Sequence, residues 1–367
     1  MLCQKKQVVG VIVLVLVVVV GVWYRSNNRT ENISPENKVV IKIGATLPLT
    51  GDVAFLGGPH KQAMLMALED VQKASSLKYN YQIIFEDDQF NSTKAVTAAN
   101  KLVSVDGTKA LVSFGSPAGN AINPIAQLNK VVHINGFASD PNVAKGEYNF
   151  VHWTPPYEEA GLLVKELESR GIKKVVVFDL NHSGALPLSE SFVDMADKQG
   201  IEVAARYTSN PEDRDFRTII QKAKAQGAEM FVILLPSPYV EILAKQIKEF
   251  GVKTPMTSIE SFQFTDQPQL FTGLWYVTGA EMKDWFVQQF TQNYGVAPNM
   301  GSGNGYDVVA LLIKAFEKAG DGKNAPSSED LSKALGSIKN FDGAMGDNMK
   351  FDQEGIVVTK ATVKIVP

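Results

Sequence analysis

The chain has 367 residues, of which 45% are hydrophobic, and its 36 lysines and arginines against 39 aspartates and glutamates give a net charge of −3. This charge provides no basic surface for nucleic acid, and the length is sufficient for two or three domains with large cores. Cys3 is the single cysteine, which excludes an intrachain disulfide and a cysteine-based metal site.

The N-terminal residues predict a membrane segment followed by a polar linker. No charge lies between Lys6 and Arg25, and a helix over this run would be roughly 27 Å long, close to the hydrocarbon thickness of a bilayer. No small-x-small cleavage site follows the run, which favours an uncleaved transmembrane helix over a cleaved signal peptide. We therefore expect residues 1–25 to be a membrane anchor or signal and residues 26–38 to be a flexible linker.

Beyond the linker, short apolar runs alternate with amphipathic stretches, a pattern typical of parallel sheets covered by helices. The expected strands are 39–47, 81–86, 110–114, 131–135, 174–178, 201–207 and 230–235. The expected helices, with apolar residues at three- and four-residue spacing, are 60–75, 93–105, 118–129, 158–170, 188–199, 216–226 and 239–250. This order predicts an α/β fold with two doubly wound parallel-sheet lobes, in which ligands bind beyond the carboxyl ends of the strands.

Two serines are placed to begin helices at such strand ends. Ser92 follows a strand that ends in acidic residues, and its side chain can cap a helix. Ser116 follows another strand and precedes Pro117, a preferred first helical residue, so we expect Ser116 to be an N-cap. Backbone N–H groups near Ala118 and Gly119 would then be available for a carboxylate. The alternative is an ordinary cap without a ligand.

Other sequence patterns do not indicate a metal, nucleotide or catalytic site. Asp87 and Asp88 lie together, but no further carboxylates have metal-ligand spacing, and the four histidines show no H-x-x-x-H pattern. The glycines of residues 301–307 precede a late helix instead of following a first strand, so we expect no dinucleotide site. G-x-S-x-G and phosphate-binding G-x-x-x-x-G-K-[ST] motifs are absent from the sequence. We expect no cofactor, no metal and no catalytic apparatus.

Several stretches resemble the leucine/isoleucine/valine-binding protein family, which comprises extracytoplasmic solute-binding proteins with a type I periplasmic-binding fold. The stretches are IGATLPLTGDVAFLG (43–57), FEDDQFNSTKAVTAANKLV (85–103), NGYDVVALLIKAFEKAG and MKFDQEGIVV. The resemblance covers almost everything after Lys38. It implies two lobes joined by a three-stranded hinge, with crossings near Trp153, Thr278 and Met345. The implied lobes are 39–153 with 279–345 and 154–278 with 346–367.

The resemblance also implies a set of ligand-binding residues. Ser116 and the N–H groups near Ala118 and Gly119 match the first carboxylate contact, Ala138 and Ser139 match the second, and Glu260 matches the acid that pairs with the α-ammonium group. Tyrosines of the relatives' cleft are replaced here by Leu56, Ser183 and Ser237, which leaves the identity of the ligand open. Nearby aromatic residues could form the walls of the site: Phe55, Phe137, Trp153 and Tyr239.

The resemblance leads us to expect a membrane-anchored, extracytoplasmic receptor of an ABC importer, or a periplasmic one if the signal is cleaved. It would bind an amino acid or an analogue by closing two lobes on it, and its partners would be the permease and ATPase subunits. Two alternatives remain, a sensing module for a separate signalling protein and a binder of an aromatic acid or amide. Neighbouring permease and ATPase genes would separate the importer from the sensor.

Overall fold

The computed structural model describes residues 38–74, 76–265 and 267–367. The predicted membrane segment and all of the predicted linker before Lys38 lie outside the described residues. Within the described ranges, no helix is both long enough and apolar enough to cross a membrane.

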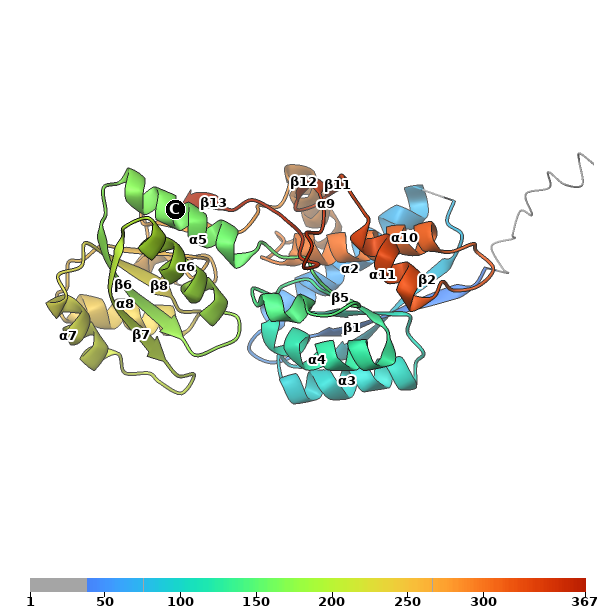
Figure 1. Cartoon of the computed structure of the whole chain (residues 1–367), viewed down its shortest axis with the longest axis horizontal. Coiled ribbons are helices and arrows are strands. Elements are labelled where there is room, and N and C mark those ends of the chain that lie inside the picture. The colour runs from blue at the N-terminus through green and yellow to red at the C-terminus, as the bar shows by residue number, and fades with distance from the viewer. Residues whose placement is uncertain (1–37, 75, 266) are drawn as a thin grey trace, which may run out of the picture. The chain divides into compact units, whose positions relative to one another are not determined.

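In the described chain, a first parallel sheet has the strand order β2-β1-β3-β4-β5 (Figure 1). Its strands are β1 (Val40–Leu47), β2 (Asn80–Asp87), β3 (Ala110–Ser113), β4 (Val132–Asn135) and β5 (Asn149–Val151). Both β3 and β4 are buried along their whole length. Their buried polar side chains are hydrogen-bonded to one another, because Ser113 contacts the His133 ring at 2.7 Å and accepts from the Asn135 amide at 2.7 Å.

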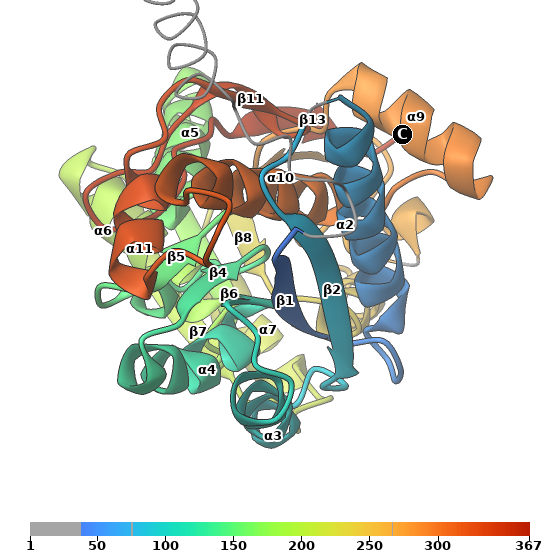
Figure 2. The same cartoon turned by 90° about the vertical axis from the view of Figure 1, so that its right-hand side faces the viewer.

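Helices cover both faces of this sheet. The helices are α2 (Ala54–Ala74), α3 (Ser92–Ser104), α4 (Ser116–Asn129), α10 (Ser302–Ala319) and α11 (Ser328–Gly336), and Pro141–Ala144 is a short 3-10 helix. Figure 2 shows α3 and α4 on one side of β1 and β2, and α2 and α10 on the other. Leu102 of α3 and Ile122 of α4 pack with Leu111 of β3 in one buried cluster.

A second parallel sheet follows, with the strand order β7-β6-β8-β9. Its elements are α5 (Pro156–Ser169), β6 (Lys174–Leu180), α6 (Leu186–Lys198), β7 (Glu202–Ser209), α7 (Arg217–Ala225), β8 (Met230–Leu234), α8 (Tyr239–Glu249) and β9 (Met256–Ser258). Alternate residues of β6 enter different cores. Val177 packs with α5 and α6, whereas Phe178 packs with α7 and α8.

The remaining elements connect the two sheets. They are the 3-10 helix Pro268–Leu270, β10 (Trp275–Thr278), α9 (Asp284–Tyr294), β11 (Phe341–Gly343), β12 (Gly346–Met349) and β13 (Thr362–Ile365). β10 pairs with β13, and β11 pairs with β12. Thr154 lies where the connecting segments meet, because its Oγ1 is 2.8 Å from Thr359 Oγ1 and accepts the Ala280 N–H at 2.9 Å.

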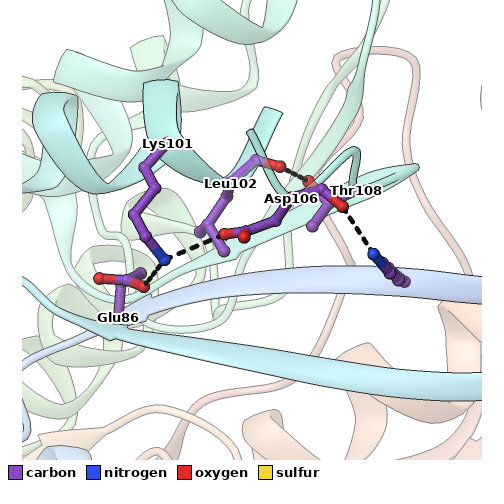
Figure 3. Close-up of polar contacts among 6 residues, drawn as sticks. Glu86, Lys101, Leu102, Asp106 and Thr108 are labelled. Atoms are coloured by element: carbon purple, nitrogen blue, oxygen red, sulfur yellow. Dashed lines mark hydrogen bonds and ion pairs between the residues drawn. The ribbon is translucent and has the colours of Figure 1, made fainter. Parts of the chain in front are cut away.

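An exposed charge cluster closes the turn after α3. Lys101 donates to Glu86 on β2 at 2.5 Å and to Asp106 at 3.1 Å, and Thr108 donates to the Leu102 carbonyl (Figure 3). Because these charges are solvated, each ion pair contributes little by itself. The packing of the buried Leu102 side chain holds α3 in place.

Two of the expected helix starts require correction. The helix predicted over 60–75 begins at Ala54, because Gly57 allows its first turn to lie against Pro48, where a Cβ would come within 2.1 Å of the Pro48 carbonyl oxygen. Ser92 is the first helical residue of α3, and the capping side chain is that of Asn91, which accepts from the Lys94 N–H at 3.1 Å.

Candidate functional site

Ser116 begins α4 at the carboxyl end of β3, but it does not cap the helix as expected. Gly115 is the N-cap, with a φ of 82°, and a Cβ there would lie 2.5 Å from the Phe90 ring. The buried Ser116 hydroxyl instead accepts the Asp140 N–H at 3.2 Å. Ser116 therefore joins two loops of the first sheet.

The start of α4 offers fewer free donors than the sequence suggested. The Gly119 N–H is already bound to the Gly115 carbonyl at 3.0 Å, and Pro117 has no N–H. The Ser116 and Ala118 N–H groups belong to the first turn, where no intrahelical partner exists. Together with the positive end of the helix dipole they can attract an anion.

The turn after β4 packs against this helix start. Ala138, Ser139 and Asp140 are all buried. The Asp140 carboxylate accepts from the Asn120 amide at 2.7 Å and from the Asn142 N–H at 2.9 Å, which fixes the turn beside α4. The predicted pair Ala138 and Ser139 thus lies next to Ser116. Asp140 was missed because a short Asp-Pro turn has no ligand-specific signal in a sequence.

A loop of the second sheet reaches the same place. A Cβ at Gly184 would lie 3.7 Å from the Ser116 hydroxyl, so the half-buried residue before it, Ser183, also lies close to the start of α4. The His182 ring stacks on Phe90, with ring centroids 6.4 Å apart and an angle of 18°. The predicted residues Ser116 and Ser183 are therefore brought together across the two sheets.

Leu56 and Ser237 are less clearly part of the site. Leu56 is buried in the first turn of α2. Ser237 is half-buried between β8 and α8. Ser237 as a ligand-binding residue stays a prediction.

Glu260 follows β9 in the left-handed conformation, with a φ of 60° and its N–H bound to the Val277 carbonyl at 2.8 Å. Few residues other than glycine adopt this conformation, and strain of this kind is common at functional sites. Burial raises the pKa of Glu260 to about 7, and the neighbouring Glu159 and Trp153 side chains act against this rise. The buried Trp153 indole N–H has no hydrogen-bond acceptor among the residues that the structure describes.

Glu159, on the first turn of α5, is the second acidic group of the site and was missed by sequence reasoning. Its side chain is fully buried, and neither carboxyl oxygen has a hydrogen-bond partner in the described chain. Burial, followed by the charge of Glu260, raises the pKa of Glu159 well above its usual value. About a hundred residues separate the two acids in sequence, so no local motif could indicate that they meet.

Aromatic rings link the serine side of the site to the acidic side. The Phe137 ring stacks on Phe114, with centroids 4.2 Å apart. Its centroid lies 4.3 Å from that of Trp153 and 5.8 Å from that of Phe264, in the loop after β9. Phe137 and Trp153 were expected as walls. Of the other two expected wall residues, Phe55 is largely exposed and Tyr239 packs on Arg214.

A small cavity of about 50 Å³ lies beside Trp153. Residues of α10, of the β10–β13 pair and of the connecting segments line it, including Thr154, Gln263, Gly279 and Asn304. Such a volume holds a few water molecules. A solute of amino-acid size therefore requires the lining segments to move apart.

The fold and the site define the class of protein. Loops from two parallel α/β sheets converge on a helix start, an aromatic wall and buried acids, an arrangement suited to holding a small solute. The chain belongs to the periplasmic binding protein family, whose sequence profile matches residues 40–364. Membership in this family places the chain among extracytoplasmic binding proteins and not among enzymes.

Individual relatives are distant in sequence but similar in fold. A Leu/Ile/Val-binding protein homolog 3 of Brucella melitensis is 25% identical over 323 residues, covering 83% of this chain and 86% of the relative. A leucine-binding protein of Thermotoga maritima superposes with a TM-score of 0.79 at 23% identity, over 89% of this chain and 95% of that one. A Rhodopseudomonas palustris solute-binding protein in complex with 3,4-dihydroxybenzoic acid superposes with a TM-score of 0.75 at 18% identity. The superposition covers 89% of this chain and 93% of that one.

Proposed function

We propose that the chain is the solute-binding receptor of an ABC importer and that its ligand is an amino acid or an amino-acid-like compound. Leucine, isoleucine and valine are the first candidates, because the Brucella relative is a Leu/Ile/Val-binding protein homolog and the Thermotoga relative is a leucine-binding protein. The permease and ATPase subunits of the importer would be its partners.

The observation that carries this proposal is the chemical difference between the two ends of the site. One end has Ser116, the free N–H groups of the first turn of α4 and the positive end of a helix dipole, which suit a carboxylate. The other end has the buried Glu260 carboxyl group, for which the described chain supplies no lysine or arginine partner. An α-amino acid presents a carboxylate and an ammonium, and so complements both ends.

The proposed mechanism is closure of two lobes, each built on one sheet. The connecting segments meet at Thr154, Ala280 and Thr359, where a hinge would lie. The sequence-based lobes were 39–153 with 279–345 and 154–278 with 346–367. The pairing of β12 with β11 and the bridge of Val151 with Ile356 support a last crossing nearer Thr359 than Met345. A ligand that contacts both lobes favours the closed state by its differential affinity.

The aromatic wall favours a second candidate, an aromatic acid. Phe137 stacks on the buried Phe114 ring and packs at an angle of 53° against Trp153, and a carboxylate at the helix start would leave an aromatic ring of the ligand near these side chains. The Rhodopseudomonas relative with bound 3,4-dihydroxybenzoic acid has the same fold. A ligand of this kind would have no cation for Glu260.

A thermal-shift screen of the chain from Lys38 onward distinguishes the two candidates. We would test L-leucine, L-isoleucine, L-valine, benzoate and 3,4-dihydroxybenzoate. The matched controls are 4-methylvalerate, which lacks the ammonium of leucine, and isoamylamine, which lacks its carboxylate. The proposal predicts stabilisation by at least one amino acid and by neither control at equal concentration. Stabilisation by the aromatic acids alone would replace the amino-acid assignment with the second candidate.

A further inference from the structure

Glu159 and Glu260 form a buried acid pair whose charge the protein does not compensate. Glu159 is fully buried and Glu260 is 7% exposed. Both oxygens of Glu159 and Oε1 of Glu260 have no hydrogen-bond partner among the described residues. A buried carboxylate without a partner is costly, and such groups are retained mainly where they have a function.

The charged groups around the pair have partners of their own. The flanking strands β9 and β10 contain no charged residue. At the nearby cavity, Lys364 pairs with Glu281 at 2.7 Å, and Lys283 pairs with Asp347. On α5 itself, Glu158 is half-buried and Glu166 pairs with Arg170 at the far end. In the described chain no cation is therefore placed to neutralise the two carboxylates.

The pair consequently retains a proton near neutral pH. Burial raises the pKa of Glu260 to about 7, and burial together with the Glu260 charge raises that of Glu159 further. Two carboxylates this close repel each other, so the pair loses one of its two protons more easily than the other. The two carboxyl groups share the proton that remains.

We propose that Glu159 and Glu260 form one cation subsite, in which an ammonium group of the ligand takes the place of the proton that the two carboxyl groups share. This inference rests on the proposed function and extends it, because it assigns Glu159 to the site and makes ligand binding release a proton. The ammonium remains protonated, the carboxyl group loses its proton, and solvent takes that proton up.

The geometry provides a route for such an ammonium. Trp153 and Gly279 line the cavity, and a Cβ at Gly279 would lie 3.6 Å from Glu159 Oε1, so this carboxyl group lies directly behind the lining of the cavity. An ammonium has three donors and can therefore satisfy oxygens of both acids at once. An aromatic acid has no such donors and would leave the shared proton in place.

Isothermal titration with L-leucine at pH 7 in phosphate and in Tris tests the inference, since these buffers differ in ionisation enthalpy. We expect the wild type to release up to one proton for each leucine bound. Its affinity should rise several-fold between pH 6 and pH 7 and flatten above the pKa of the pair. Glu159→Gln should reduce the release, because Glu260 is then the one carboxyl group of the pair that can lose a proton, and the double variant with Glu260→Gln should release none. Glu158→Gln, which changes the preceding half-buried acid, should behave like the wild type.

The outcomes separate this inference from the proposed function. Leucine binding without proton release, or with the same release in Glu159→Gln, would overturn the acid-pair subsite and leave the amino-acid receptor intact. If benzoate binds and leucine, isoleucine and valine do not, both the acid-pair subsite and the amino-acid receptor are contradicted. Should Glu159→Gln fail to fold, the buffer comparison on the wild type decides, because a structural acid pair that keeps its proton releases none.

Discussion

At the scale of single residues, Glu260 is the group whose charge the proposed ligand needs most. Glu260→Gln preserves the shape of the side chain but leaves the ammonium of an amino acid with a neutral acceptor. Hydrogen bonds to charged groups contribute roughly 1.5–3 kcal/mol, so affinity should fall on the order of 10- to 100-fold. Calorimetric titration with L-leucine measures this change. Equal affinity of the variant and the wild type would contradict the amino-acid assignment.

Ser116→Ala should lower the stability of the protein as well as its affinity for the ligand, because the Ser116 hydroxyl also holds the turn after β4. Its removal leaves the buried Asp140 N–H without a partner, which costs about 1–3 kcal/mol of stability. The N–H groups of α4 remain, so affinity should fall by only about 1 kcal/mol. Chemical denaturation and titration on the same sample separate the two effects. A loss of affinity as large as that of Glu260→Gln would show that the hydroxyl dominates carboxylate binding.

Buried histidines should make the protein sensitive to mild acid. His133 is fully buried between Ser113 and Asn149, and burial lowers its pKa to about 4. Because the folded pKa lies below the unfolded value, stability is fully present above about pH 6.5 and is lost as pH falls toward 4. One pKa unit corresponds to about 1.4 kcal/mol, so this residue alone accounts for roughly 3 kcal/mol.

The comparison of wild type with His133→Gln isolates that contribution. The variant lowers stability at pH 7.5 through altered packing, but its urea midpoint should fall less steeply between pH 6.5 and pH 4.5. Buried acids such as Asp307, whose pKa burial raises to about 7, change stability in the opposite direction and are common to both proteins. Parallel pH profiles of the two proteins would mean that His133 does not titrate on unfolding.

Sequence patterns predicted which residues gather at the strand ends better than they predicted what the side chains of those residues contact. Ser116 and Ser139 follow strand ends, so their meeting at one edge of a sheet was predictable. The N-caps lie one residue earlier than predicted, because Gly115 and Asn91 adopt the required backbone conformations. Glu159 was not predictable, since its partner acid comes from a distant strand and only tertiary packing brings the two together.

At the scale of elements, the first turn of α2 depends on one glycine. A Cβ at Gly57 would lie 2.1 Å from the Pro48 carbonyl oxygen, whereas one at Gly58 meets nothing within 4 Å. Gly57→Ala should therefore force the helix away from β1 and destabilise the protein by several kcal/mol. Gly58→Ala should be neutral or stabilise by up to about 1 kcal/mol, as expected for glycine replaced by alanine in a helix. Thermal melts of both variants provide the comparison.

Similar melting temperatures for the two variants would show that α2 can shift without cost. The affected segment, Ala54 to Pro59, is also where prediction of the elements failed, because two glycines and a proline usually end a helix. The seven predicted strands were found, since long buried apolar runs identify them. The short strands β5, β10 and β13 were missed because each forms only through its neighbours.

At the scale of the whole molecule, the N-terminal residues decide where the receptor resides. We expect the full-length protein to sediment with membranes and the chain from Lys38 onward to remain in the supernatant and to fold, since the family profile begins at residue 40. Fractionation followed by mass spectrometry of the mature N-terminus checks this. A mature N-terminus between Gly21 and Asn32 would replace the anchor with a cleaved signal.

Closure of the two lobes is the largest motion that the proposed function requires. The small cavity beside Trp153 must open before an amino acid enters, and the segments that meet at Thr154 are the ones that must bend. The cognate solute at about 100 times its dissociation constant should raise stability by roughly 2.7 kcal/mol. Small-angle scattering should show a smaller radius of gyration with L-leucine than without it.

Thr154→Val tests whether a hinge at Thr154 controls the change in the radius of gyration on ligand binding. The variant loses the hydrogen bond to Thr359 and leaves the Ala280 N–H without an acceptor, so the free protein should sample a wider range of lobe orientations and show a larger radius of gyration. Thr97→Val, on the exposed surface of α3, is the matched control and should scatter like the wild type. A saturating ligand contacts both lobes and should restore the compact state in Thr154→Val, at the cost of weaker apparent affinity. Identical scattering of wild type and Thr154→Val, with and without leucine, would contradict a hinge at this threonine.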